Sequence, residues 1–178
     1  MGNKHNRLAS LFAIMALVLL LLGTSCGNTK SAPESASGPP GSVIINPKSQ
    51  AAKPASQIKV SIEIIPAGWG VSAAEVQVSF DPTKLEALSV EAGGALGTKP
   101  LLGTLKIDND RGTIVYALAR LGETTAPGVK GVLANLEFRA KSGATGTAKI
   151  ELTKVGLSDE NFQDITGVKY EGAVIVFP

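Results

Sequence analysis

A period-two alternation of apolar and polar residues recurs between residues 43 and 178 and constrains the fold more than any other feature. In its clearest stretch, residues 58–64, isoleucine or valine alternates with lysine, serine and glutamate. The same pattern returns in segments 76–80, 105–107, 114–118, 132–138 and 150–152. Because successive side chains of a strand point to opposite faces, these segments predict half-buried antiparallel strands. The last segment, 172–177, is continuously apolar and predicts a strand covered on both faces.

Turn-forming residues separate these segments, as at Asp81-Pro82 and Ser142-Gly143. Asn, Asp and Gly tolerate the backbone angles that tight hairpins need. Eight or nine short strands at this spacing predict one all-β sandwich, which is long enough to form a core without disulfide bonds. Two segments depart from the pattern: we expect a loop at 48–56 and the only helical piece at 159–165.

The N-terminus has the pattern of an export signal. Lys4 and Arg7 precede an apolar run over residues 8–22, which is short for a membrane span. The following segment LLGTSC resembles a bacterial lipobox, which implies that Cys26, the only cysteine, carries the lipid.

These features predict three parts: a lipoprotein signal peptide at 1–25, a disordered lipidated stalk at 26–42 and the folded domain at 43–178. The stalk is rich in small residues and proline, which cannot bury enough surface to fold. We therefore expect an exported protein that the lipid alone holds to the bacterial cell envelope, with its domain facing outward.

The residue inventory argues against catalysis. The only histidine, His5, lies in the signal peptide, so the domain lacks both imidazole and a free thiol. This excludes Ser-His-Asp and Cys-His catalysis and histidine-ligated zinc. The acidic residues fall mostly at outward strand positions or in turns, which indicates a solvated face rather than a glycosidase pair. Asp108-Asn109-Asp110 lacks the closing glutamate of a calcium loop and indicates a hairpin turn.

The charge balance argues against nucleic acid as a partner. The chain carries 17 Lys and Arg against 15 Asp and Glu. Since Lys4 and Arg7 leave with the signal peptide, the mature protein is close to neutral. A nucleic-acid-binding domain would need a clustered basic face.

Four segments resemble the cohesin family in order and spacing. They are AAEVQVSFDPTKLEALSVEAG, IDNDRGTIVYALARLG, GVLANLEFRAKSGATGTAKIEL and VGLSDENFQDITGVKYEGAVIVF. The resemblance implies a nine-stranded jelly-roll β-sandwich over residues 43–178. It also implies a cell-surface, non-catalytic module that captures dockerin-bearing, polysaccharide-degrading enzymes and so serves polysaccharide catabolism. In such complexes the dockerin carries the calcium, so no cofactor or metal is expected here.

The resemblance further implies a partner-binding face on the third, fifth and sixth strands. The matching positions are Glu75, Gln77, Val115, Ala117 and Arg120. Arg120 stands where many dockerin-binding cohesins carry an acid.

Two other roles stay open. In one, the domain binds carbohydrate directly, with Trp69 in a glycine-flanked loop as the contact. The favoured interpretation of Trp69 is instead a plug over the end of the sandwich, because large aromatic residues are usually mostly buried. In the other, the chain is a structural or adhesive surface lipoprotein.

Overall fold

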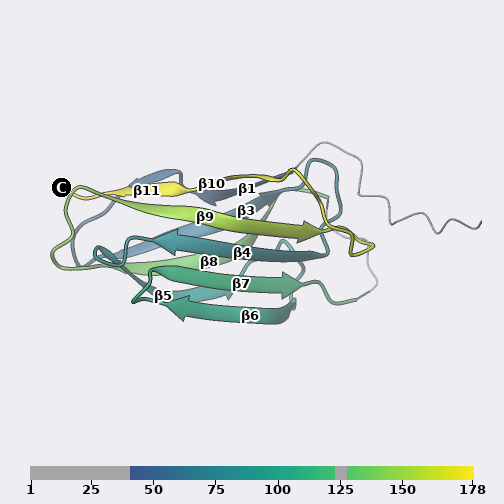
Figure 1. Ribbon diagram of the computed structural model, residues 1–178, viewed down its shortest axis with the longest axis horizontal. Coiled ribbons are helices and arrows are strands. Elements are labelled where there is room, and N and C mark those ends of the chain that lie inside the picture. Colours follow the sequence, from purple (N-terminus) through teal and green to yellow (C-terminus); the bar gives the residue numbers. More distant parts are fainter. Residues whose placement is uncertain (1–40, 123–127) are drawn as a thin grey trace, which may run out of the picture. The chain divides into compact units, whose positions relative to one another are not determined.

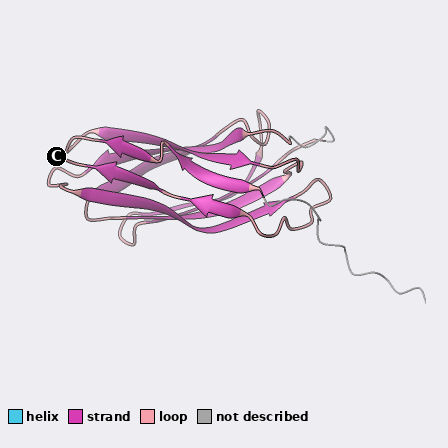
Figure 2. Ribbon diagram, turned by 90° about the horizontal axis from the view of Figure 1, so that it is seen from above, coloured by secondary structure: helices cyan, strands magenta, loops and turns pink. Residues whose placement is uncertain are grey.

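The computed structural model describes residues 41–122 and 128–178. The predicted signal peptide, Cys26 and stalk residues 26–40 lie outside the described residues. Within the described ranges there are eleven strands and no helix (Figures 1 and 2). It follows that no helix in this part of the chain could cross a membrane.

The strands form two sheets, which we call sheet A and sheet B. Sheet A contains, in spatial order, β10 (Lys169–Glu171), β1 (Ser42–Asn46), β3 (Gln57–Ile65), β8 (Gly131–Ala140) and β5 (Leu85–Ala92). Sheet B contains β2 (Ser49–Ala51), β11 (Ala173–Val176), β9 (Thr147–Ser158), β4 (Ala73–Phe80), β7 (Thr113–Ala119) and β6 (Leu101–Asp108). Every strand that the alternation predicts lies in one of these two sheets. The predicted all-β sandwich is therefore confirmed.

The first and last segments of the domain each cross from sheet A to sheet B. Strand β1 pairs in parallel with β10, and β2 pairs in parallel with β11. Pro47, which lacks an N–H donor, separates β1 from β2, and Gly172 separates β10 from β11. If β1 with β2 and β10 with β11 are each counted as one strand, the eleven strands become the nine expected for a jelly roll. The loop prediction for 48–56 is wrong in part, because β2 lies within that segment.

The core lies between the inner faces of the two sheets. Its aromatic centre is an edge-to-face contact between Phe80 and Phe138, whose ring centroids are 5.2 Å apart. Tyr116 is 2% exposed, as its inward position predicts, and burial raises the pKa of its phenol. Alternation therefore identifies the core-facing side of each central strand.

The helix predicted at 159–165 is wrong. The Asp159 carboxylate accepts hydrogen bonds from the backbone N–H groups of Asn161 (2.8 Å) and Gln163 (2.9 Å). Phe162 has a positive φ of 59°, which ends any helical path. An Asx turn at Asp159 thus competes successfully with helix formation.

Two predictions about strand coverage are also wrong. In the last strand Ile175 is fully buried but Val176 is 41% exposed, so only one face is covered. The predicted inward face of β6 is open to solvent at Leu105, which is 42% exposed. Strand β6 is one of the two edge strands of sheet B, and an edge strand can extend past the opposite sheet.

Candidate partner-binding face on sheet B

The outer face of sheet B brings four of the predicted site residues into direct contact range. Glu75 on β4 lies opposite Ala117 on β7, and Gln77 lies opposite Val115. All four alternate with buried neighbours and are half-buried. Directly opposed residues on one sheet face are close neighbours, so these side chains form a continuous surface across two central strands.

A hollow of about 340 Å³ lies at one end of this face. Its floor consists of small residues from four adjacent strands: Ala73, Gly103, Ala117, Ala119 and Gly156. Its rim is formed by Glu75, Leu101, Ser158 and Asp164. Because alanine and glycine leave space above a sheet, the hollow can receive a side chain from a partner.

An ion pair defines the charge at the edge of the hollow. Lys154 Nζ on β9 donates to Glu75 Oε1 at 2.8 Å. This hydrogen bond is the main reason that the pKa of Glu75 is held below its usual value. Glu75 is therefore ionised at neutral pH, with its charge balanced by Lys154.

Arg120 lies just past the end of β7 and outside the outward row formed by Val115 and Ala117. Its backbone N–H donates to the carbonyl of Ser72 at 2.8 Å. The bond joins the end of β7 to the residue before β4. The structure thus places Arg120 at the end of the face and not in its centre.

The other two predicted site residues lie elsewhere. Trp69, in the loop between β3 and β4, is partly buried and packs against the core. This packing agrees with a plug over the end of the sandwich, and the role of Trp69 as a sugar contact stays a prediction. Cys26 lies outside the described residues.

A model of the cohesin domain matches residues 41–176, which include every described strand. This chain belongs to the cohesin family. The resemblance found in the sequence is thereby confirmed. Because cohesins are non-catalytic protein-interaction modules, so is this domain. Cohesin domains are generally extracellular or cell-surface modules.

Solved cohesin structures share this fold at low sequence identity. The sixth cohesin of scaffoldin B from Acetivibrio cellulolyticus, solved with a mutant Cel5 dockerin, has a TM-score of 0.66 and 21% identity, with 79% of this chain and 100% of that chain covered. A non-cellulosomal cohesin from the archaeon Archaeoglobus fulgidus has a TM-score of 0.62 and 16% identity, covering 79% and 92%. The Coh-OlpA module of a Clostridium thermocellum type I cohesin–dockerin complex has a TM-score of 0.66 and 14% identity, covering 79% and 100%. No curated protein gives a significant match.

Part of the lining of the sheet B hollow was not predicted from the sequence. The missed residues lie on β6, on β9 and in the segment after β9. Leu101 and Gly103 precede the alternating part of β6, and Gly156 lies beyond the alternating part of β9. Asp164 joins the rim through a bridge to Ser158. No local pattern marks these residues, because only the pairing of the strands brings them together.

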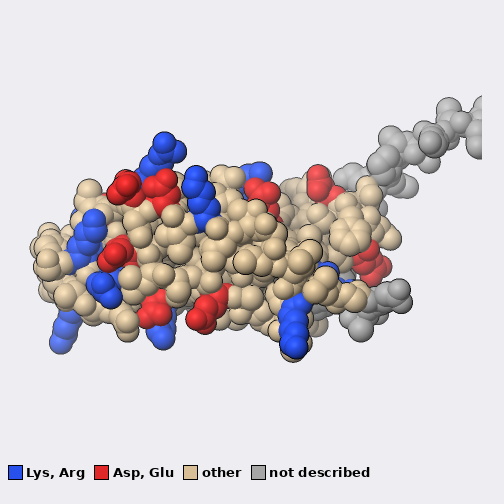
Figure 3. All heavy atoms as spheres, turned by 90° about the horizontal axis from the view of Figure 1, so that it is seen from below, with Lys and Arg blue, Asp and Glu red and all other residues tan. Residues whose placement is uncertain are grey.

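The surface charge of this cohesin is mixed. On the side shown in Figure 3, basic and acidic side chains are interspersed and neither sign forms a continuous patch. Such a surface gives no support to nucleic acid as a partner.

Proposed function

We propose that this cohesin captures a dockerin-type module with the outer face of sheet B. The observation that carries the proposal is the hollow on that face, which lies beside the row of Glu75, Gln77, Val115 and Ala117. The cohesins of Acetivibrio cellulolyticus and Clostridium thermocellum named above were solved bound to dockerins, and they share this fold.

Each part of the face has a distinct role in this proposal. Gln77 and Glu75 offer hydrogen-bond acceptors and one amide donor to polar groups of the partner. Val115 and Ala117 offer a flat apolar surface that excludes water from those bonds. The hollow receives one protruding side chain and so fixes how the partner is seated.

The calcium of the complex belongs to the dockerin. Within the described residues there is no group of three or more His, Cys, Asp or Glu residues that could hold a metal ion. In this proposal chelation acts on the partner, and a folded cohesin after chelation is an expected outcome.

The place of capture is the outside of the cell envelope. Cleavage before Cys26 and lipidation of its thiol would tether the domain, and the residues between Cys26 and β1 would hold it away from the membrane. The captured enzymes would degrade polysaccharides close to the cell that takes up the products.

Titration calorimetry tests the capture. The full chain, purified in mild detergent, is titrated with a panel of calcium-loaded dockerin modules from polysaccharide-degrading enzymes and again after chelation. We expect saturable binding that chelation abolishes.

Ala117→Arg, which fills the hollow with a charged side chain, should weaken binding at least a hundredfold. Ser142→Arg, in the exposed turn between β8 and β9, is the control and should bind normally. Absence of binding across the panel, or equal affinity for both variants, would refute the proposal.

A further inference from the structure

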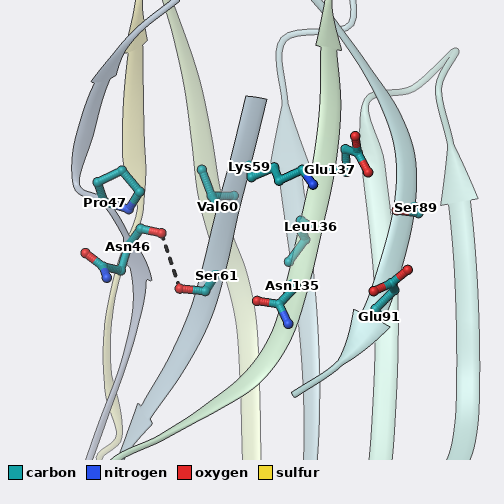
Figure 4. Close-up of a pocket in the computed structure, with 10 residues that line it drawn as sticks. All are labelled: Asn46, Pro47, Lys59, Val60, Ser61, Ser89, Glu91, Asn135, Leu136 and Glu137. Carbon is teal, nitrogen blue, oxygen red and sulfur yellow. Dashed lines mark hydrogen bonds between the residues drawn. The ribbon is translucent and has the colours of Figure 1, made fainter. Parts of the chain in front are cut away.

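The opposite face of the sandwich carries a second hollow, on the outside of sheet A. Its volume is about 460 Å³, and it extends across β1, β3, β8 and β5 (Figure 4). Unlike the hollow on sheet B, it is lined mainly by longer polar side chains.

Strand register arranges these polar side chains in two rows that cross the sheet. In the first row Asn46 lies opposite Ser61, Ser61 opposite Asn135, and Asn135 opposite Glu91. Adjacent strands are 4.7–4.9 Å apart, so this row spans about 14 Å. In the second row Glu137 lies between Lys59 and Ser89. The rows suit a ligand that is extended and lies across the strands.

Most of these groups have hydrogen-bonding capacity that the protein leaves unused. Over residues 41–122 and 128–178, the side chains of Lys59, Ser89, Glu91, Asn135 and Glu137 make no hydrogen bond or ion pair. In the close-up, the single bond between drawn residues joins the Ser61 hydroxyl to the Asn46 carbonyl (Figure 4).

Several carboxylates elsewhere on this domain are paired, whereas Asp110, Glu160 and Asp164 make no ion pair among the described residues. Glu63 contacts Lys130, Glu75 contacts Lys154, and Glu86 contacts Arg139. The groove is notable because five side chains without a partner among the described residues line one hollow on the same sheet face.

The chemistry of the groove selects among ligand classes. The Asn135 amide, two hydroxyls, two carboxylates and one ammonium give both donors and acceptors with little net charge, while the Asn46 amide already donates to Glu63. A nucleic acid would need a basic groove, and a peptide would need pockets for apolar anchors. A chain of hydroxyl groups, each of which donates and accepts, matches the groove best.

We propose that this groove binds a segment of neutral polysaccharide lying across β1, β3, β8 and β5. Asn135 and Ser61 bond sugar hydroxyls at the centre, and Glu91 and Glu137 accept hydroxyl protons at one side. The ring of Pro47 gives an apolar edge for a sugar ring. Trp69 has no part in this site. The inference goes beyond dockerin capture, since the two sites lie on opposite faces of the sandwich.

Titration by NMR tests the groove residue by residue. The probes are cellohexaose, xylohexaose and mannohexaose, added to the nitrogen-15-labelled full chain in detergent. We expect at least one of them to shift the amide signals of residues 59–61, 89–91 and 135–137, with a Kd of about 1 mM or tighter. Asn135→Ala should raise that Kd about fivefold, the effect expected for one lost hydrogen bond. Thr153→Ala, on the exposed face of sheet B, is the matched control and should leave it unchanged.

The same spectra report whether each variant is folded, so a misfolded variant cannot be mistaken for a loss of binding. The proposal is overturned if none of the three hexasaccharides shifts the groove signals, or if the shifts gather around Trp69 instead. It is also overturned if Asn135→Ala and Glu91→Ala, each folded, bind as the unmutated chain does. None of these outcomes depends on dockerin binding, so the two proposals fail separately.

Discussion

At the scale of single residues, Glu63 shows how a charged group is buried on an outer sheet face. The side chain follows Lys59 and Ser61 on the outward side of β3, yet Glu63 is only 7% exposed. Asn46 donates to its Oε1 at 2.9 Å, and Lys130 Nζ lies 2.7 Å from its Oε2. The bond from Lys130 is the main cause that holds the pKa of Glu63 below its usual value of 4.5.

We therefore expect Lys130→Met to destabilise the domain at pH 7 by about 1 kcal/mol, because it leaves the carboxylate short of a partner. A carboxylate with a lowered folded-state pKa contributes its full stabilisation above pH 4.5 and loses it as the pH falls through the folded-state value. The difference between variant and unmutated chain should thus shrink below pH 4.5. Urea unfolding at neutral and acidic pH measures it, and a difference that is independent of pH would contradict this account.

Glu75 makes a second prediction at the same scale, which rests on the proposed function. Glu75→Lys places two ammonium groups side by side at the position of the ion pair with Lys154. Dockerin affinity should fall at least tenfold, or about 1.4 kcal/mol. Calorimetry on the double variant Glu75→Lys, Lys154→Glu distinguishes loss of the ion pair from loss of a direct contact with the partner. Restored affinity would mean that the ion pair only shapes the face, whereas continued loss would mean that Glu75 contacts the partner.

At the scale of strands and turns, alternation predicts where a strand lies in the sequence and which of its side chains point inward. It does not predict whether the opposite sheet covers those side chains. This is why the central strands β3, β4, β7 and β8 are predicted correctly. It is also why Leu105 and Val176 are exposed against expectation. Coverage depends on the extent of the opposite sheet, which no local sequence pattern encodes.

The hairpin between β6 and β7 gives a prediction at this scale. Gly112 has a φ of +65°, and an added Cβ would lie 2.2 Å from the carbonyl oxygen of Phe80. Gly146, in the turn before β9, has a similar φ of +69° but nothing within 4 Å of an added Cβ. Gly146→Ala should cost only the positive φ, about 1–2 kcal/mol.

Gly112→Ala should cost at least about 3 kcal/mol, because backbone would have to move as well. Thermal and urea unfolding of both variants measure the difference. Equal losses would show that the turn can shift away from Phe80 without breaking the pairing of β4 with β7.

At the scale of the whole domain, the candidate sites illustrate what the sequence can and cannot specify. Glu75, Gln77, Val115 and Ala117 could be named because the resemblance to cohesins marks their positions, and alternation within each strand puts them on an outward face. The polar rows of sheet A could not, because neighbours such as Ser61 and Asn135 lie 74 positions apart in the chain and meet only through strand register. Both hollows are products of topology.

The two-layer architecture makes one further prediction, which combines both proposals. The proposed dockerin face belongs to sheet B and the polar groove to sheet A, and the core between them fills the space with well-packed side chains. A partner bound on one face therefore touches nothing on the other, and a rigid core gives it no second arrangement to favour.

We expect the hexasaccharide Kd to change less than twofold when dockerin saturates the chain. Repeating the NMR titration with the complex measures this. A large change in either direction would mean that the sandwich transmits strain between its sheets or that the partner reaches around the β5 and β6 edges. In either case capture of an enzyme and retention of its substrate would be linked.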